Sequence, residues 1–477
     1  MKPSPPALLF ALGMPLAVLA ADSWPAFRGA NSSGIGAANA RPPAQMSPAN
    51  NVLWSIEVPW SPGSPCVWGD RIFLGSFHEG KLETRAYSTG DGKLLWTQAL
   101  SVPKLEEFHA TEGSPAAATP VTDGKTVVNY FGSFGLVAYD TKTGSERWRL
   151  PLPVADTLGN FGSGTSPLLV GDRVILNRDL AVGSHILAVD LKSGKKLWDT
   201  PRPDSITSYG SPIVWEHDGQ REIVMAGSLS MKAYDLKTGA ERWVLRGLAS
   251  FTCTTPVAGD GLLYYAGWSP GKADAPWPSW DSTAEKQDKN GDGKITPDEF
   301  QGGGPEWFRA QDVNRDGFLT REDWDSIGNN MKLGENVLMA VKPGAKGAAG
   351  PEQVAWKFTK GLPYVPSPLF YQGRIYIIRD GGMMSSFDAK TGEPHYAQER
   401  IGVTGSYYAS PVAADGRIYV SSLDGKFSVI KAGGEKPEVL HTADFGERIS
   451  ATPALVGDRL YLRTKSKLYA FGSSASR

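Results

Sequence analysis

Short apolar runs separated by Gly, Asp and Asn repeat along almost the whole chain. Each repeat opens with Ser or Thr followed by Pro, and two apolar runs then flank a turn such as Gly-Asp-Arg, as in Ser166–Leu176 and Thr452–Leu462. The runs are β-branched or aromatic and too short for helices, so they predict antiparallel strands. The prolines that open the repeats are Pro65, Pro120, Pro167, Pro212, Pro256, Pro368, Pro411 and Pro453.

The spacing of these prolines gives the period of the chain. Neighbouring prolines lie 42 to 55 residues apart, except that Pro256 and Pro368 are separated by 112 residues. Four short strands in a period of this length are typical of a propeller blade. The sequence therefore predicts eight four-stranded blades, with an inserted segment in the fifth.

A second phrase, Ala-Tyr-Asp-x-Lys-Thr-Gly-x-x-x-Trp, follows within each repeat. It is clearest at Ala138–Trp148 and Ala233–Trp243 and varied at Ala86–Trp96 and Ala188–Trp198. Asp can bond its own backbone and Gly accepts positive φ, so the phrase predicts the hairpin between strands three and four. We expect the closing Trp to pack against the neighbouring blade, with Trp356 in that place in blade five, Tyr396 in blade six and Leu440 in blade seven.

The eighth repeat ends at Phe471 without a fourth strand, whereas the chain begins with an unassigned one at Asn51–Val58. Its Leu-Trp pair matches the end of the other repeats. The N-terminal strand is therefore expected to complete blade eight, which leaves no long unpaired sheet edge. The alternative is a disordered N-terminal tail with a chance Leu-Trp pair, and the completed strand count favours the closing strand.

Composition adds little to this picture, but the N-terminus adds a compartment. The 49 basic and 50 acidic residues nearly balance, which does not favour binding to nucleic acid or an anionic membrane surface. The apolar stretch Ala7–Ala20 follows Lys2 and ends in small residues, which predicts a cleaved signal peptide and a periplasmic or secreted protein. No segment is long enough to span a bilayer. We expect a signal peptide at 1–20, an extension at 21–50, the propeller at 51–266 and 335–472, an insertion at 267–334 and a tail at 473–477.

The chain has two cysteines, Cys66 and Cys253. Export would permit a disulfide, but the repeat count places the two residues in opposite blades of the ring. Their separation would exceed the roughly 7 Å that a disulfide allows. Two buried free thiols are expected.

The inserted segment carries two twelve-residue loops that are typical of Ca²⁺ sites. A hard cation takes six to eight oxygen ligands, which such loops supply from positions 1, 3, 5, 7, 9 and 12. Gly293 permits the sharp turn of the first loop, and Ile295 should form a short β-bridge with Leu319. The first loop offers Asp288, Asn290, Asp292, the Lys294 carbonyl, Thr296 through water and Glu299.

The second loop departs from the usual pattern at position 12. It offers Asp312, Asn314, Asp316, the Phe318 carbonyl, Thr320 and Asp323, where Glu is usual at the last position. One methylene less favours a monodentate contact, so we expect weaker Ca²⁺ binding or more Mg²⁺ tolerance there. An acidic turn that binds nothing is the alternative, and two loops in tandem argue against it. Because extracellular Ca²⁺ is abundant, a stabilising metal is expected rather than a sensor.

The Thr-Gly-x-x-x-Trp phrase and the blade period resemble those of the PQQ-like propeller proteins, a group that includes quinoprotein dehydrogenases and the outer-membrane assembly factor BamB. The opening Ser23–Gly29 also resembles a leader found in bacterial members. The resemblance implies the propeller fold and leaves the function open. A dehydrogenase of this group would hold PQQ and a central Ca²⁺ and oxidise an alcohol or sugar, with an adjacent cysteine pair against the cofactor. This chain has no adjacent cysteines, and its acidic candidates Glu112, Asp179 and Asp380 suit turns or ion pairs equally well.

A non-enzymatic binding scaffold requires less of the sequence. Residues just before each Ser/Thr-Pro should ring the central funnel, where they form a concave site for a peptide or small ligand or merely fill it. An adhesive role of the insertion is a third hypothesis. We expect a monomeric scaffold without a lipid anchor, because no Cys follows the predicted cleavage site. The funnel candidates are Asn160, Tyr209, Thr252, Tyr364, Arg379, Tyr407 and Arg448.

Overall fold

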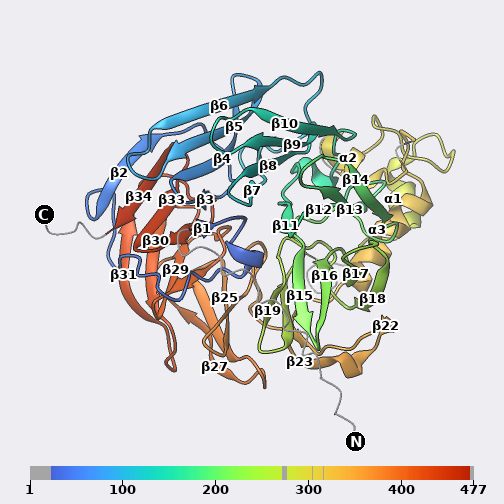
Figure 1. Cartoon of the computed structure of the whole chain (residues 1–477). Helices are drawn as coiled ribbons and strands as arrows, with labels where there is room; N and C mark the ends of the chain where they lie inside the picture. The colour runs from blue at the N-terminus through green and yellow to red at the C-terminus, as the bar shows by residue number, and fades with distance from the viewer. Residues whose placement is uncertain (1–22, 271–276, 303–304, 315, 473–477) are drawn as a thin grey trace, which may run out of the picture.

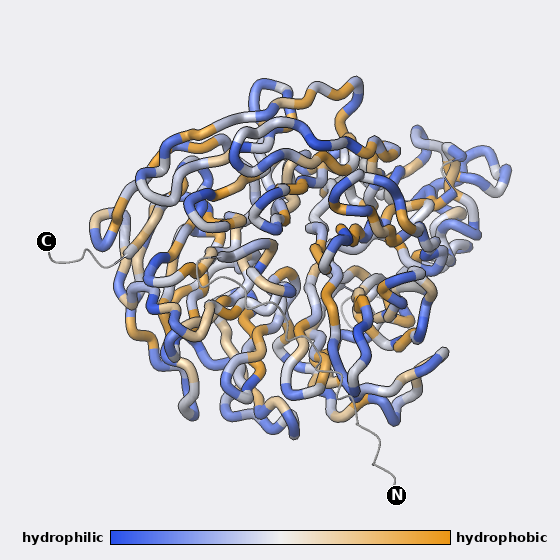
Figure 2. The backbone as a smooth tube through the Cα atoms, in the orientation of Figure 1, coloured by the Kyte–Doolittle hydropathy of each residue, from blue (hydrophilic) through white to orange (hydrophobic). Residues whose placement is uncertain are grey.

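The computed structural model describes residues 23–270, 277–302, 305–314 and 316–472. The predicted signal peptide and the tail at 473–477 lie outside the described residues. Eight antiparallel sheets surround a central channel (Figure 1), which confirms the eight-bladed propeller. Figure 2 shows apolar and polar residues mixed along the strands, with hydrophilic turns at the periphery.

Six blades take their four strands from one continuous stretch of chain. In blade five this stretch is interrupted by the insertion, and blade eight combines strands from both ends of the chain. Blades one to four consist of β3 (Cys66–Trp68), β4 (Arg71–His78), β5 (Lys81–Ser88) and β6 (Leu94–Leu100); β7 (Val121–Thr122), β8 (Thr126–Phe131), β9 (Gly135–Asp140) and β10 (Glu146–Pro151); β11 (Leu168–Val170), β12 (Arg173–Arg178), β13 (His185–Asp190) and β14 (Lys196–Pro201); and β15 (Ile213–His217), β16 (Gln220–Ala226), β17 (Ser230–Asp235) and β18 (Glu241–Arg246).

The second half of the ring repeats this order. Blades five to eight consist of β19 (Val257–Gly259), β20 (Leu262–Gly267), β21 (Val337–Val341) and β23 (Val354–Phe358); β24 (Leu369–Tyr371), β25 (Arg374–Arg379), β26 (Met383–Asp388) and β27 (Pro394–Arg400); β28 (Val412–Ala414), β29 (Arg417–Ser421), β30 (Lys426–Lys431) and β31 (Glu438–Asp444); and β32 (Ala454–Val456), β33 (Arg459–Arg463) and β34 (Lys467–Gly472), completed by β2 (Val52–Glu57).

The ring is closed by the two ends of the folded chain. β2 pairs antiparallel with β34, with Trp54 opposite Ala470 and Glu57 opposite Lys467. The prediction of an N-terminal closing strand is confirmed. Blade eight therefore has four strands, as its neighbours have, and its outer strand comes from the N-terminal part of the chain.

The closing Trp of one blade packs on the Thr-Gly turn of the next. In blade two, Asp140 Oδ1 accepts hydrogen bonds from the amides of Lys142 and Thr143, both at 2.9 Å, and fixes the turn. The indole N–H of Trp96 in blade one donates to the Thr141 carbonyl of this turn at 3.1 Å. Gly144 lies against that indole with φ of +72°, and a Cβ there would be 2.7 Å from a ring carbon. The turn therefore needs Gly for its backbone and for the close approach.

Trp243 is an exception to this docking, because blade five has no Thr-Gly turn to receive it. It is buried among residues of blades four and five, and its indole N–H donates to Glu222 Oε2 of its own blade at 3.0 Å. β22 (Gly347–Ala349), which belongs to the connection between β21 and β23, pairs in parallel with β18 and places Gly347 opposite Trp243.

In blade seven the expectation for Leu440 was wrong. β31 has the same bulge as the outer strands of the other blades, and His441 lies opposite Val429 in the place of the closing Trp, while Leu440 is 40% exposed. The hairpin before it is longer, because Lys431 lies opposite Glu438 whereas Asp140 bonds Ser145 in blade two, and this displaces the residue that takes the place of Trp. The His441 Nε2 atom lies 2.7 Å from the Met46 carbonyl of the N-terminal extension. Tyr396 does occupy the corresponding place in blade six, opposite Ser386.

The insertion leaves blade five between β20 and β21, as predicted. It contains α1 (Trp280–Gln287), α2 (Pro305–Gln311) and α3 (Arg321–Leu333). Ile295 and Leu319 form the predicted antiparallel bridge, with reciprocal amide-to-carbonyl hydrogen bonds of 2.9 Å. The helices enclose a small core of their own around this bridge, formed by Trp280, Ile295, Phe308, Leu319 and Trp324.

The N-terminal extension crosses one end of the central channel. β1 (Ser23–Trp24) adds to the inner edge of blade one by pairing with β3, and the fully buried Arg28 donates to the Pro368 carbonyl of blade six at 2.8 Å. The segment then contacts blade four near η1 (Ala30–Ser32) and forms a parallel bridge from Ile35 to Ala413 of blade seven. The extension therefore links both halves of the ring.

Both cysteines are free, as predicted. Cys66 is fully buried in β3, and its thiol lies 3.2 Å from the Pro25 carbonyl. Cys253 is only partly buried, which corrects the expectation of two buried thiols, because it faces the channel. No helix in the described parts of the chain is long and apolar enough to cross a membrane.

Candidate functional site in the central channel

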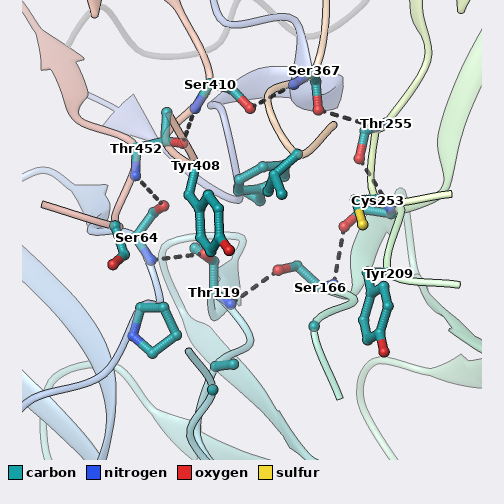
Figure 3. A pocket seen from close by; sticks show the side chains of 18 of the residues that line it. Ser64, Thr119, Ser166, Tyr209, Cys253, Thr255, Ser367, Tyr408, Ser410 and Thr452 are labelled. Carbon is teal, nitrogen blue, oxygen red and sulfur yellow. Dashed lines mark hydrogen bonds between the residues drawn. The ribbon is translucent and has the colours of Figure 1, made fainter. Parts of the chain in front are cut away.

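A closed ring of hydrogen bonds surrounds the channel at the Ser or Thr that opens each blade (Figure 3). In each blade this residue donates its backbone N–H to the side-chain hydroxyl of the corresponding residue in the next blade. We call these eight residues the belt. The bonds are 2.9–3.0 Å long and run in one direction through Ser64, Thr119, Ser166, Ser211, Thr255, Ser367, Ser410, Thr452 and back to Ser64.

The local sequence explains why the belt forms. The residue before Pro is held in an extended conformation, and this directs its N–H sideways toward the next blade. A hydroxyl can accept that bond in a buried place where an unpaired N–H would be costly. The Ser/Thr-Pro phrase therefore marks blade contacts and gives no evidence of a nucleophile.

A cavity of about 200 Å³ lies within the belt. All eight belt residues line it, and Phe27 of the N-terminal extension contributes to the lining. The other lining side chains come from the connections between blades and are mostly aromatic or small. They include Glu112, Phe161, Ser163, Tyr209, Cys253, Tyr364, Tyr408 and Ser450. We call the part lined by Glu112, Phe161, Tyr209, Tyr364 and Tyr408 the mouth.

The structure brings three of the funnel candidates to this cavity. Tyr209 and Tyr364 line it directly. Arg448 reaches the same place by an ion pair with Glu112, and its guanidinium carbon lies 5.7 Å from the centroid of the Tyr408 ring. Asn160 ends η2 (Leu158–Asn160), directly before the lining residue Phe161.

Three other candidates point elsewhere. Thr252 is buried and donates to the Gly227 carbonyl at 3.0 Å, and Arg379 donates to Gln398 Oε1 at 3.0 Å. Tyr407 is buried in the core of blades six and seven, whereas its neighbour Tyr408 lines the cavity. Successive side chains of extended chain face opposite sides, so a shift of one residue separates core from lining.

Two of the three acidic candidates have structural partners away from the cavity. Asp179 forms a fully buried, bidentate ion pair with Arg202, with N–O distances of 2.7 and 3.0 Å. Asp380 lies in the turn between β25 and β26 and accepts the Tyr407 amide at 2.8 Å, which links this turn to the connection before blade seven. Glu112 is the one charged residue among the described residues that line the cavity.

The cavity also contains tyrosine hydroxyls and a thiol, whose ordinary pKa values already lie above neutral pH. Burial raises several of these values further. It raises the pKa of the Cys253 thiol to about 12 and, as the largest of several causes, the pKa of Tyr408 to about 12. The pKa of Tyr209 is raised well above its ordinary value, chiefly by burial. At neutral pH the lining therefore carries one negative charge, which faces Arg448.

The sequence did not reveal Glu106, a buried acid behind the cavity wall. Its Oε2 atom accepts hydrogen bonds from the Ser163 amide at 2.9 Å and the Ser163 hydroxyl at 2.7 Å. Burial outweighs these bonds and raises the pKa of Glu106 to about 7. In the sequence Glu106 stands beside Glu107 and resembles part of an exposed charged segment, so no pattern distinguishes it.

The first calcium loop is folded around its own carboxylates. Asp288 accepts hydrogen bonds from the amides of Gly291 and Gly293 at 2.8 and 2.9 Å, and Gly293 has φ of +81°. Glu299 accepts the amides of Lys289 and Thr296 at 3.1 and 2.9 Å. Backbone amides thus hold both end positions of the twelve-residue loop, positions 1 and 12, in place.

The second loop repeats these bonds with a shorter last residue. Asp312 accepts the Gly317 amide at 2.9 Å, and Asp323 accepts the amides of Val313 and Thr320 at 3.1 and 3.0 Å. Asp323 therefore occupies the place that Glu299 has in the first loop. Within the described residues, no group of three or more His, Cys, Asp or Glu side chains lies close enough together to hold a metal ion in this conformation.

The insertion contacts the connections that form the mouth. α2 packs on η2, which directly precedes Phe161. Arg309 of α2 also forms an ion pair with Glu107 at 3.0 Å, in the connection between blades one and two. The calcium loops are thereby linked to two connections that line the cavity, through α2.

Comparison with known proteins places this geometry in a family. The family model described as outer membrane protein assembly factor BamB matches residues 79–258 and 337–476, on either side of the insertion. A model described as EF hand matches residues 286–302 and 306–327, which contain both twelve-residue loops in full. Among curated proteins, none matches this chain.

Solved structures show the same fold at low sequence identity. BamB from Moraxella catarrhalis has a TM-score of 0.56 and 16% identity, and the match covers 88% of this chain and 98% of that one. The computationally designed Ika8 protein has a TM-score of 0.56 and 12% identity, with coverage of 89% and 100%. A europium-containing methanol dehydrogenase has a lower TM-score of 0.45 and 11% identity, with coverage of 95% and 98%. The chain belongs to the propeller family described as outer membrane protein assembly factor BamB, with an EF-hand pair inserted into its fifth blade.

Proposed function

We propose that this protein is an exported, calcium-binding propeller that acts as a non-enzymatic binding scaffold. The observation that carries the proposal is the chemistry of the channel cavity. Aromatic rings, hydroxyl groups and one carboxylate line about 200 Å³, a space suited to a small group rather than a large cofactor. The family description, an assembly factor, also favours binding over catalysis.

The alternative, a PQQ-dependent dehydrogenase, fits these residues poorly. PQQ carries three carboxylates, so its site needs cationic partners. No Lys or Arg is among the described residues that line the cavity, and the nearby Arg448 is already paired with Glu112. Cys253 stands alone, whereas the resemblance implied an adjacent pair. The residues of the cavity therefore do not fit PQQ.

Calcium would be held by the two loops of the insertion. The anchored carboxylates of Asp288 and Glu299 in the first loop, and of Asp312 and Asp323 in the second, suit a hard cation. Bound calcium would neutralise these charges and stabilise the insertion against the mouth connections through α2.

Export and a monomeric state complete the proposal. Residues 1–20 have the pattern of a signal peptide, and the family description refers to the outer membrane, which favours a periplasmic location. A peptide or small ligand at the channel mouth would be the partner, and the mature protein should elute as a monomer in size-exclusion chromatography with light scattering.

One experiment separates scaffold from dehydrogenase. The purified mature protein is incubated with PQQ and Ca²⁺, and cofactor absorbance and dye-linked oxidation of alcohols and sugars are measured. We expect neither stoichiometric PQQ binding nor turnover, and we expect EGTA to lower the thermal unfolding temperature. Stoichiometric PQQ binding with turnover would overturn the scaffold proposal.

A further inference from the structure

The mouth of the channel presents aromatic faces to the cavity. Tyr209, Tyr364 and Tyr408 are partly exposed in the lining, and Phe161 is 41% exposed beside them. Figure 3 shows the ring of Tyr408 inside the belt and that of Tyr209 just beyond Ser166, on the opposite side of the view. Aromatic faces carry a negative quadrupole potential, and their attraction for a cation increases when water is excluded.

The charge of the cavity has the matching sign. Glu112 supplies the one formal charge among the described lining residues, and its side chain remains 27% exposed and accessible. The tyrosine hydroxyls and the Cys253 thiol are neutral at physiological pH, and burial moves the pKa values of Tyr209, Tyr408 and Cys253 further above it. In the free protein Arg448 offsets this charge, so an incoming cation gains an ion pair where it replaces Arg448, whereas no Lys or Arg among the described lining residues would receive an anion.

The chain already places one cation in this environment. Arg448, which is 24% exposed, contacts Glu112 Oε2 through Nη2, and its guanidinium lies 5.7 Å from the centre of the Tyr408 ring. Arg448 thereby combines a carboxylate contact with a cation–π contact at the edge of the mouth. It shows which kind of group these residues accommodate, and it competes with any ligand of the same kind.

We infer that the channel mouth binds an organic cation, an ammonium or guanidinium group held between Glu112 and the aromatic rings of Tyr209, Tyr364 and Tyr408. The group could belong to a small free amine or to a Lys or Arg side chain of a partner protein. This inference rests on the proposed scaffold function, because it assigns a ligand class to the same cavity. Binding requires Arg448 to leave Glu112, so the free protein holds the site closed.

The test measures binding of four probes by calorimetry and by ligand-observed NMR. Choline and N-acetyl-lysine methylamide are the cationic probes, which represent the free and the side-chain source. 3,3-Dimethylbutan-1-ol has the shape of choline without its charge, and PQQ is the anionic probe. We expect millimolar or tighter binding of at least one cationic probe and weaker binding, by about tenfold or more, of the neutral one. Equal binding of choline and its neutral counterpart would overturn the inference.

Matched variants identify the site. E112Q should weaken binding of the cationic probe by about tenfold, and the control E107Q, outside the cavity, should leave it unchanged. Y408L should weaken binding by about fivefold, whereas Y408F keeps the ring and should retain it. R448Q should tighten binding by about fivefold because it removes the competing cation. Thermal unfolding of each variant shows whether it is folded.

The outcomes separate this inference from the proposed function. Absence of cation binding in a folded protein that also fails to oxidise alcohols would overturn the cation site and leave the scaffold proposal standing. PQQ binding with turnover would overturn the scaffold proposal itself. An R448Q variant that binds the cationic probe no better than the unaltered protein would contradict the competition assigned to Arg448.

Discussion

Blades three and five begin in the same way and end differently. Both start from a belt residue, Ser166 or Thr255, and both pair their first two strands through a tight turn. Blade three continues directly through β13 and β14. Blade five sends out the calcium-loop insertion between β20 and β21 and then returns β22 to blade four before adding β23.

The comparison shows which parts of a blade are free to vary. The belt and the inner strands fix the place of a blade in the ring, because they contact both neighbours. The outer connections only need to return the chain to the next strand, so one of them can hold a separate small core. Blade three relies on contacts repeated around the ring, whereas the insertion of blade five relies on features that occur once, namely its aromatic core and its proposed metal ions.

The strongest test of this contrast removes a repeated contact. Trp148 of blade two donates to the Leu191 carbonyl of blade three at 2.7 Å and packs on Gly194 of the Thr-Gly turn. W148A should lower the free energy of unfolding by about 3–5 kcal/mol, because it opens a buried cavity and leaves the carbonyl unpaired. Urea denaturation measures the loss. W307A, which alters an indole that is 53% exposed on α2, should cost less than about 1 kcal/mol; similar losses would remove the contrast.

Calcium removal tests the other side of the comparison. With free Ca²⁺ at about one hundred times the dissociation constant, binding to the first loop should add about 3 kcal/mol, which EGTA would remove. Hydrogen exchange should rise in residues 288–323 and stay unchanged in blade three. E299Q should abolish the tighter of two calorimetric transitions and D323N the weaker. Equal affinities at both loops would contradict the weaker second loop expected from Asp323.

Glu106 makes the connection between blades one and two sensitive to pH. Unfolded Glu loses its proton near pH 4.5, whereas folded Glu106 loses it near pH 7, so the folded state binds more protons between these values. The free energy of unfolding should therefore fall by about 2.5 kcal/mol as pH rises from 4.5 to 7. E106Q should remove this contribution, and E107Q should keep it. Urea titrations at several pH values provide the measurement, and an unchanged slope in E106Q would refute the assignment.

A single belt bond should matter less, because seven others remain. S166A leaves the buried Thr119 amide without its acceptor and should cost about 1–2 kcal/mol. S101A, an exposed serine in the connection after blade one, is the matched control and should change stability by less than about 0.5 kcal/mol. If the two variants unfold alike, the belt contributes little beyond geometry.

The smallest effect should come from the ion pair between the two regions. Arg309 and Glu107 are each about half exposed, so R309A should cost less than about 0.5 kcal/mol. A larger loss would mean that the insertion and the cavity are more tightly coupled than the packing of α2 on η2 implies. The same would follow if adding Ca²⁺ shifted the fluorescence of the mouth connections and R309A abolished that shift.

The features that the sequence predicted well are those that repeat. The Ser/Thr-Pro spacing and the Thr-Gly-x-x-x-Trp phrase predict the blade count, the hairpins and the closing strand, since each copy supports the others. The Ile295–Leu319 bridge followed from the fixed positions of calcium loops. Periodic patterns report local geometry, and blade geometry is local.

The features that occur only once could not be predicted from the sequence. Tyr408 faces the cavity instead of Tyr407, because neighbouring side chains of extended chain face opposite sides. His441 takes the place expected for Leu440, because the hairpin of blade seven is longer than the Thr-Gly hairpin. Glu106 has no signal, since its burial depends on connections from two blades. Ser23–Gly29 resembles a leader of the family, but the path of Arg28 across the channel depends on its contact with Pro368, more than three hundred positions away.

The pairing of β2 with β34 also has a consequence for how the molecule assembles. Loop-closure entropy opposes contacts that are distant in sequence, and Trp54 can meet Ala470 only after almost the entire polypeptide has been made. The last blade should therefore form late and slowly, while earlier blades acquire structure as nearest-neighbour units. Until then two unpaired strand edges remain exposed to other chains. A folding catalyst or chaperone would act at this final seam, and circular permutation that joins β34 directly to β2 should speed the slowest phase of refolding.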